Sequence, residues 1–184
     1  MGTITEKIYQ LRDGRTVKIR SALERDAEAY LNLCKSIMAE EIYTLTQPHE
    51  LNFTIEQEVQ WIKSKIDNES HLVLVAEVDG EVIGQLDFSN GHRQRIAHTG
   101  DFGMGVHKDF RGVGIGSLLL SNLIDWAKHH PHHEKINLCV HQTNDRAIST
   151  YKKLGFQIEG LRTKDLKYPN GVYVDTVLMG LQLC

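Results

Sequence analysis

The pattern of apolar and polar residues predicts amphipathic helices in three parts of the chain. Near residue 115 one helical face is apolar and the other polar, and the apolar positions are Ile115, Leu118, Leu119, Leu123, Ile124 and Ala127. Capping-box sequences predict two earlier helix starts, at Ser21-x-x-Glu24 and at Thr54-x-x-Gln57. We expect the first of these two helices to run towards Met38.

Short apolar runs bounded by turn residues predict strands between these helices. Residues 72–78 and 82–88 form an expected hairpin around Asp79-Gly80, and residues 17–20, 104–106 and 136–140 form separate expected strands. After residue 156, the turn Pro169-Asn170-Gly171 separates two further strands. With 184 residues and no repeat or linker, this order predicts a single α+β domain spanning residues 1–184.

A glycine-rich turn joins the strand at 104–106 to the helix near residue 115, through Arg111-Gly112-Val113-Gly114-Ile115-Gly116-Ser117. Glycines at a helix start expose backbone amides and the positive end of the helix dipole, which suits a phosphate or pyrophosphate. A Walker loop would need a lysine after Gly116, and a dinucleotide fingerprint would need a further glycine at Ser117 or Leu119, so neither motif fits. A plain tight connection between strand and helix is the structural alternative.

A second motif follows the strand at 136–140. Its defined positions are Asn144, Ala147, Tyr151, Gly155 and Phe156. Asn144 and Tyr151 are two helical turns apart, so a helix places both side chains on one face. Gly155 then ends that helix in the left-handed conformation.

Together the two motifs resemble the GNAT superfamily of acetyl-CoA-dependent N-acetyltransferases, whose pyrophosphate loop reads Arg/Gln-x-x-Gly-x-Gly/Ala. The resemblance covers residues 17–183 and implies a mixed, mostly antiparallel central sheet flanked by helices, with splayed central strands. It also implies acetyl-CoA as cosubstrate. The cofactor-binding residues that it implies are Met104, Val106, Arg111, Gly112, Val113, Gly114, Ile115, Gly116, Ser117, Asn144 and Tyr151.

The resemblance further implies roles around the thioester. Backbone groups of Met104 and Val106 would bind the pantetheine arm, and the Val106 amide would polarise the thioester carbonyl. Gly103 and Gly105 agree with this, because glycine inside a strand often marks a bulge or the close approach of another group. Tyr151 is the implied acid for the departing thiolate. Full proton transfer from a phenol to that thiolate is roughly 2 kcal/mol uphill in free solution, so a hydrogen bond alone is an alternative, as is simple packing in an apolar stripe.

An acceptor amine is mostly charged at neutral pH, so the reaction needs a base or a water relay. The candidates are Asp101, Glu41, His141 and Asp175. By position in its strand, Asp101 corresponds to the glutamate that some small-amine members of the family use, and the alternative is a solvated turn residue. In the family the loop at residues 42–53 would wall the acceptor pocket.

Composition and charge limit the classes of binding partner that we expect for this chain. A net charge of −3, with no basic run among aromatics, argues against a nucleic-acid partner, and no apolar run reaches membrane-spanning length. Three scattered cysteines, Cys34, Cys139 and Cys184, are typical of reduced thiols in the cytoplasm. The histidines at 129–133 stand at a proline-broken helix end, where we expect a solvated terminus and no metal site.

We therefore expect a cytoplasmic N-acetyltransferase that moves acetyl directly from acetyl-CoA to the primary amine of a small molecule, without a covalent enzyme intermediate. Two alternatives remain open. The acceptor could be the N-terminus of a ribosomal protein or other peptide, which requires an open groove, or the chain could be a non-catalytic module that senses coenzyme A. A homodimer and the identity of the acceptor stay undecided.

Overall fold

The computed structural model describes residues 2–40 and 42–183, so the candidate base Glu41 and the thiol of Cys184 lie outside the described residues. In the described part eight strands form one sheet, in the order β1-β2-β3-β4-β5-β6-β8-β7. The strands are β1 Lys7–Gln10, β2 Thr16–Ser21, β3 His71–Val78, β4 Glu81–Asn90, β5 Thr99–Val106, β6 Lys135–His141, β7 Gln157–Lys167 and β8 Tyr173–Gln182. All neighbours are antiparallel except β5 and β6, which confirms the expected mixed, mostly antiparallel sheet.

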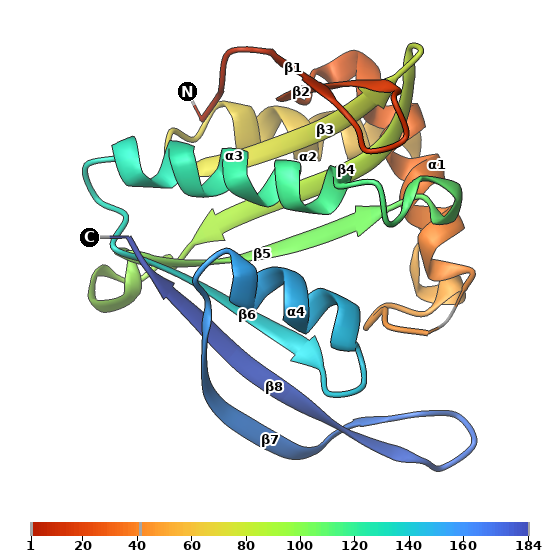
Figure 1. The fold of residues 1–184 in the computed structure, drawn as a ribbon, viewed down its shortest axis with the longest axis vertical. Coiled ribbons are helices and arrows are strands. Elements are labelled where there is room, and N and C mark those ends of the chain that lie inside the picture. The colour runs from red at the N-terminus through yellow and green to blue at the C-terminus, as the bar shows by residue number, and fades with distance from the viewer. Residues whose placement is uncertain (1, 41, 184) are drawn as a thin grey trace.

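Four α-helices cover the two faces of this sheet (Figure 1). They are α1 Ala27–Met38, α2 Ile55–Ile66, α3 Ile115–His129 and α4 Asp145–Lys153. The helix α3 packs its apolar stripe against β2 to β5, and the large core lies beneath it. A smaller core joins α1 and α2 to the opposite face, around Tyr30, Ile62 and Val75. Because apolar residues face both ways along β3, that strand is buried on both sides.

Two local predictions were wrong at the N-terminal end. The strand β1 was not expected, because its four residues are mostly exposed and show no apolar alternation. Ser21 does not begin a helix: it ends β2, and its hydroxyl accepts a hydrogen bond from the amide of Ile4 (2.8 Å). The helical segment begins with the 3₁₀ turn Glu24–Asp26, and the Asp26 carboxylate accepts from the Leu23 amide (2.7 Å). At α2, by contrast, Thr54 and Gln57 form the predicted capping box.

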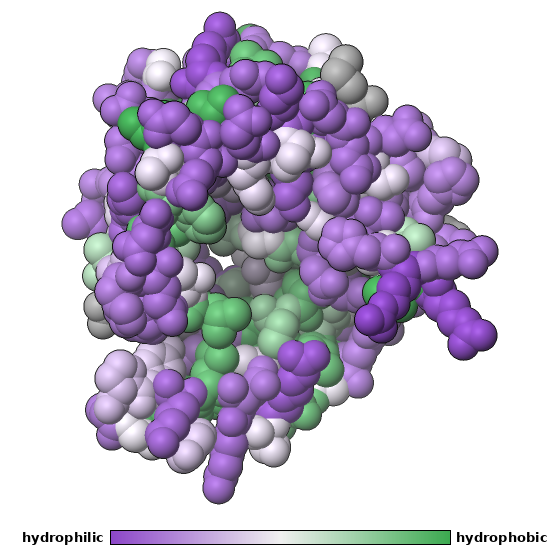
Figure 2. Space-filling model, turned by 180° about the vertical axis from the view of Figure 1, so that it is seen from behind, coloured by the Kyte–Doolittle hydropathy of each residue, from purple (hydrophilic) through white to green (hydrophobic). Residues whose placement is uncertain are grey.

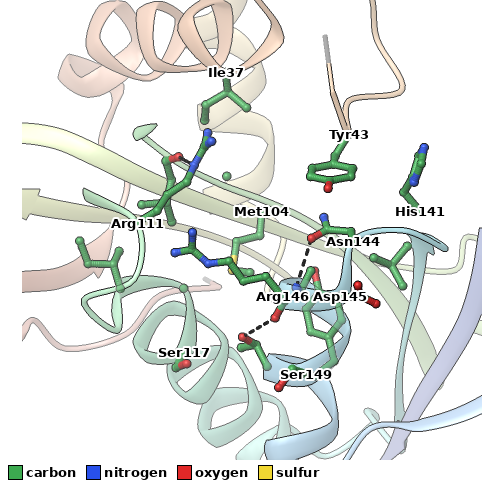
Figure 3. Close-up of a pocket in the computed structure, with 18 of the residues that line it drawn as sticks. Ile37, Tyr43, Met104, Arg111, Ser117, His141, Asn144, Asp145, Arg146 and Ser149 are labelled. Carbon is green, nitrogen blue, oxygen red and sulfur yellow. Dashed lines mark hydrogen bonds between the residues drawn. The ribbon is translucent and has the colours of Figure 1, made fainter. Parts of the chain in front are cut away.

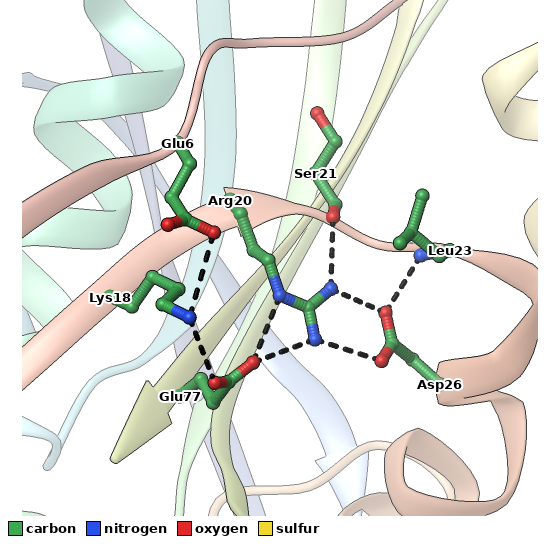
Figure 4. A network of polar contacts seen from close by, with 7 residues as sticks. All are labelled: Glu6, Lys18, Arg20, Ser21, Leu23, Asp26 and Glu77. Carbon is green, nitrogen blue, oxygen red and sulfur yellow. Dashed lines mark hydrogen bonds and ion pairs between the residues drawn. The ribbon is translucent and has the colours of Figure 1, made fainter. Parts of the chain in front are cut away.

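Asp26 also belongs to a charged network at this helix start (Figure 4). Arg20 of β2 donates two hydrogen bonds to the Asp26 carboxylate (2.6 and 2.9 Å) and two more to Glu77 of β3. Burial alone would raise the pKa of Asp26, but the hydrogen bonds from Arg20 and Leu23 outweigh it and lower that pKa. The network fastens the start of the first helix to the sheet.

The central strands separate where the resemblance implied a splay. Parallel pairing of β5 with β6 covers only Thr99–Asp101 against Lys135–Asn137. Beyond Asp101 the two strands diverge, and the rest of β5 pairs with β4 alone. This opens a gap in the middle of the sheet that no strand fills, and it confirms the expected splayed strands.

None of the described helices is long and apolar enough to cross a membrane.

Candidate active site

The gap between β5 and β6 opens into a cavity of about 830 Å³. Its wall combines the end of β5, the glycine-rich loop before α3, the first turns of α4, and residues 42–44 after α1. Figure 2 looks at the face opposite α3 and α4 and shows a hollow in the centre of the molecule, with apolar side chains along its lower side. The residues that line the cavity come from elements on both faces of the sheet, including α1 and α4.

Backbone groups of Met104 and Val106 point into the gap. The His107 amide donates to the Ile83 carbonyl (2.8 Å), and Val106 lies opposite Gly84. In an antiparallel ladder this makes Val106 and Gly84 a non-hydrogen-bonded pair, so the N–H and C=O of Val106 face away from β4. Met104, two residues earlier, has the same orientation. The strand thus presents free amides at the positions that the resemblance assigned to the pantetheine arm.

The glycine-rich loop has the conformation of an anion-binding turn at a helix N-terminus. Gly112 (φ 88°) and Gly114 (φ 112°) are left-handed, and Gly114 is the N-cap of α3. The first hydrogen bond of α3 runs from Leu118 to the Gly114 carbonyl, which leaves the three preceding amides without a helical acceptor. The strand-to-helix junction predicted from the sequence is confirmed, and its free amides face the cavity side of the loop.

The Arg111 side chain is occupied by protein groups. Its guanidinium donates to both oxygens of Glu40 (2.6 and 2.5 Å) and to the Val106 carbonyl (2.9 Å). The hydrogen bonds from Arg111 lower the pKa of Glu40. Arg111 therefore ties the end of α1 to the end of β5. Arg146, which the sequence analysis did not single out, supplies a second cation whose guanidinium lies against Gly112 (Figure 3).

Tyr151 and Asn144 both line the cavity, from α4. The Tyr151 ring packs edge-on against Phe102 at 5.9 Å between centroids, and burial raises the pKa of its hydroxyl to about 12. The hydroxyl is thus protonated at neutral pH and free to donate. Asn144 is the N-cap of α4, and its side-chain oxygen accepts from the Ala147 amide (3.2 Å). Gly155 has φ 95° and ends the helix as predicted.

A hydrogen-bonded group joins the turn between β7 and β8 to the segment after α1, next to the lining residues Ile42 and His141. Tyr168, in the β7–β8 turn, donates its hydroxyl to the Ile42 carbonyl (2.7 Å) and lies 3.0 Å from Nε2 of His141. Because that hydroxyl proton is already used, Nε2 of His141 must carry the proton between them, and Nδ1 accepts from Thr143. Tyr43 packs edge-on against the same imidazole at 5.3 Å (Figure 3). Both ring nitrogens of His141 are therefore occupied.

The candidate bases differ in their position and in their hydrogen-bond partners. His141 lines the cavity but has no free nitrogen, and Asp175 accepts the Lys164 amide (2.8 Å) in the outer hairpin. Asp101 is exposed on β5, opposite Ser89, and is absent from the cavity lining. Glu41 lies outside the described residues. The structure thus brings Tyr151, Asn144, Met104, Val106 and the glycine loop together around one cavity, and leaves Asp101 beside it.

The histidine run departs from the sequence expectation of a solvated terminus. His133 is only 6% exposed, and its ring stacks on His130 at 3.9 Å between centroids. Neither ring nitrogen of His133 has a hydrogen-bond partner among the described residues. Burial is the main cause that lowers the pKa of His133 to about 4. The run folds back because Phe88 and Trp126 provide an aromatic surface that covers it.

Splayed strands, free strand amides and a helix-start glycine loop define an enzyme class that transfers an acyl group from a thioester. The chain belongs to the acetyltransferase (GNAT) family, whose sequence profile matches residues 37–156. It is 34% identical over 166 residues to the L-amino acid N-acetyltransferase AaaT of Escherichia coli K12, covering 89% of this chain and 96% of that protein.

Solved structures agree with this fold. A GNAT-family acetyltransferase from Streptococcus pneumoniae superposes with a TM-score of 0.87 at 26% identity, covering 90% of this chain and 99% of that one. The acetyltransferase yncA from Salmonella typhimurium, solved with acetyl-CoA, superposes with a TM-score of 0.81 at 23% identity, covering 91% and 94%.

Proposed function

We propose that this acetyltransferase moves acetyl directly from acetyl-CoA to the primary amine of a small molecule. The observation that carries the proposal is the cavity of about 830 Å³ at the splayed strands, which the glycine loop, Tyr151 and the end of β5 line together. The E. coli relative, named as an L-amino acid N-acetyltransferase, supports the same acceptor class.

The cofactor would lie along the glycine loop and the gap. Free amides at 115–117 and the cationic Arg146 suit the pyrophosphate, in the turn that runs from Arg111 through Gly112, Val113 and Gly114 to Ile115, Gly116 and Ser117. The pantetheine arm would then bind the outward-facing groups of Met104 and Val106. With the thioester carbonyl at the Val106 amide, that N–H stabilises the oxyanion of the tetrahedral adduct.

Tyr151 would donate to the departing sulfur. A hydroxyl with a pKa of about 12 is a poor acid in the ground state, so its main contribution is a hydrogen bond to the developing thiolate. The amine proton must pass to a base or to solvent, and Asp101, exposed on β5, is one candidate for that step. No side chain needs to carry the acetyl group.

The acceptor class distinguishes this function from its alternatives. A peptide N-terminus is the alternative acceptor, and the amine panel includes a short peptide to test it. A non-catalytic sensor is disfavoured by the family assignment and by the retained Tyr151. A cytoplasmic location is part of the proposal, supported by the unpaired thiols of Cys34 and Cys139.

An amine panel tests the function. The purified chain is incubated with acetyl-CoA and, separately, L-amino acids, a diamine, an aromatic amine and a short peptide, and free thiol is measured over time. We expect acceptor-dependent thiol release with at least one small amine, and little release without acceptor. Thiol release with the peptide and with none of the small amines would favour the alternative acceptor. The absence of acceptor-dependent release with every compound of the panel would contradict the proposed activity.

A further inference from the structure

A carboxylate that the sequence analysis did not single out lies against the strand that borders the gap. Asp87 of β4 pairs with Gly103 of β5, and its Oδ1 is 3.0 Å from the point that a Cβ on Gly103 would occupy. The carboxylate therefore covers the α-carbon of Gly103, which lines the cavity. A Cβ on Gly105, two residues on, would meet Ile37 of α1 at 2.6 Å, so this is the face that α1 and α2 cover.

The Asp87 carboxylate has no side-chain hydrogen-bond partner among the described residues. It joins none of the ion pairs formed among the described residues, and the hydrogen bond to its carboxylate comes from its own amide. Lys65, the cation of α2 on this face, donates instead to the hydroxyl of Ser89. Tyr30 of α1 likewise donates to Gln85 (2.9 Å). The carboxylate is partly buried and keeps some access to solvent.

The groups that face Asp87 come from every neighbouring element. Helix α2 contributes Glu58, which is 7% exposed, and Lys65. Helix α1 contributes Tyr30 and Cys34, and β5 contributes Asp101 on the same face. Burial raises the pKa of Asp87, and the charge of Lys65 opposes that rise only in part. The same desolvation, with the charge of Asp87, raises the pKa of Glu58.

An unpaired carboxylate in such a place destabilises the fold, because desolvation penalises its charged form. Because its pKa is higher in the folded than in the unfolded state, the carboxyl group favours folding most at low pH. The free energy of unfolding falls as the pH rises and the folded protein must ionise the group. Groups of this kind gather at functional sites, where a carboxylate with a raised pKa is a better proton acceptor than an ordinary one. Among the other candidate bases, His141 has both ring nitrogens occupied and Asp175 lies in the outer hairpin, whereas Asp87 and Asp101 both stand next to lining residues of β5.

We propose that Asp87 receives the ammonium group of the acceptor on the α1 and α2 side of Gly103 and takes its proton, directly or through one water. This inference rests on the proposed function and identifies Asp87 as the general base of that reaction. The amine nitrogen then attacks the thioester carbonyl, so that a C–N bond forms and the C–S bond breaks. A second nitrogen proton reaches the thiolate through Tyr151, and Asp87 returns the first proton to solvent. The products are the neutral amide, free thiol and one proton.

The substitution Asp87→Asn tests this role, since the amide keeps the shape of the side chain but cannot accept a proton. With an amine that the wild type turns over, we expect kcat/KM to fall by on the order of 10²-fold or more at pH 7. The loss should shrink towards the pKa of the amine, where more acceptor is already neutral. Acetyl-CoA affinity by calorimetry should stay within about twofold, since Asp87 lies away from the loop amides.

Thermal unfolding distinguishes a catalytic from a structural role. Replacing an unpaired carboxylate by a neutral group should leave the melting temperature unchanged or raise it. A structural role would instead lower the melting temperature and reduce kcat/KM equally at every pH. Asp79→Asn is the matched control, because Asp79 is exposed at the β3–β4 turn and touches no part of the cavity.

Two further variants complete the test. In Gly103→Ala the new methyl group would press on Oδ1 of Asp87, so we expect a partial loss of kcat/KM with unchanged acetyl-CoA affinity. Asp101→Asn is measured in parallel. Wild-type kinetics in Asp87→Asn would overturn the inference, and a loss confined to Asp101→Asn would assign the base to Asp101. Failure of the wild type with every amine contradicts the proposed function itself, which is a separate result.

Discussion

At the scale of single residues, Tyr151 combines two properties that the transfer reaction needs. Its ring is held by Phe102 and Phe156, and its hydroxyl faces the cavity with a pKa raised by burial. In Tyr151→Phe the ring packing stays while the hydroxyl is lost. We expect turnover to fall on the order of 10²-fold while acetyl-CoA affinity is nearly constant. Steady-state kinetics and calorimetry on the folded variant check this, and unchanged turnover would leave Tyr151 as a core residue only.

His133 is a buried polar residue that lowers the stability of the fold. Its folded-state pKa of about 4 lies below the ordinary value of 6.5, so the unfolded chain binds a proton more tightly. Stability should therefore fall as pH drops from 6.5 towards 4, by on the order of 3 kcal/mol from this group. His130 and His71, whose pKa values are also lowered, add to the trend.

The substitution His133→Phe removes both the titration and the unpaired ring nitrogens. We expect a higher free energy of unfolding at pH 7 and a weaker pH dependence between 6.5 and 4, measured by urea denaturation at several pH values. His129→Gln is the control, because the His129 side chain is 80% exposed. If the two variants show the same pH dependence as the wild type, the burial of His133 does not govern acid stability.

At the scale of elements, the glycine loop acts through its backbone. A side chain at Gly114 would meet no protein atom within 4 Å, so it would project into the open space beside the loop. In Gly114→Asp a carboxylate would stand where the pyrophosphate needs bare amides. We expect acetyl-CoA binding to be lost in calorimetry. Gly171→Asp is the control with a similar backbone, φ 85° and open space, in a turn far from the loop.

The start of the first helix depends on a charge pair more than on its predicted cap. The side chains of Arg20 and Asp26 are 11% and 7% exposed, so Asp26→Ala leaves a desolvated guanidinium with Glu77 as its remaining partner. We expect a loss of about 2–4 kcal/mol in urea unfolding at pH 7. Asp13→Ala breaks an exposed pair with Arg15 and should cost much less, because solvent screens that pair. Equal losses in the two variants would contradict this account.

At the scale of the whole molecule, the parts that the sequence predicts are those with local signals. The two motifs around Gly114 and Tyr151 carry turn chemistry and helical spacing within short segments, so both elements and their cavity-facing residues were predicted. Asp87, Arg146 and Tyr168 were missed because their roles depend on contacts between segments distant in the chain. The edge strand β1 was missed because its partner β2, rather than an apolar face, defines it.

The splay leaves a gap in the sheet that a bound ligand could bridge. Three residue pairs join β5 to β6, so the sheet is weakest where acetyl-CoA would bind. A ligand that spans this gap binds only the folded chain, and at a concentration of 100 times its Kd it should stabilise the fold by about 2.7 kcal/mol. We expect saturating acetyl-CoA to raise the melting temperature and to slow hydrogen exchange at the amides of Met104 and Val106. In Gly114→Asp both effects should disappear. Protection confined to the glycine loop, with the two strand amides exchanging as before, would mean that the pantetheine arm lies outside the gap.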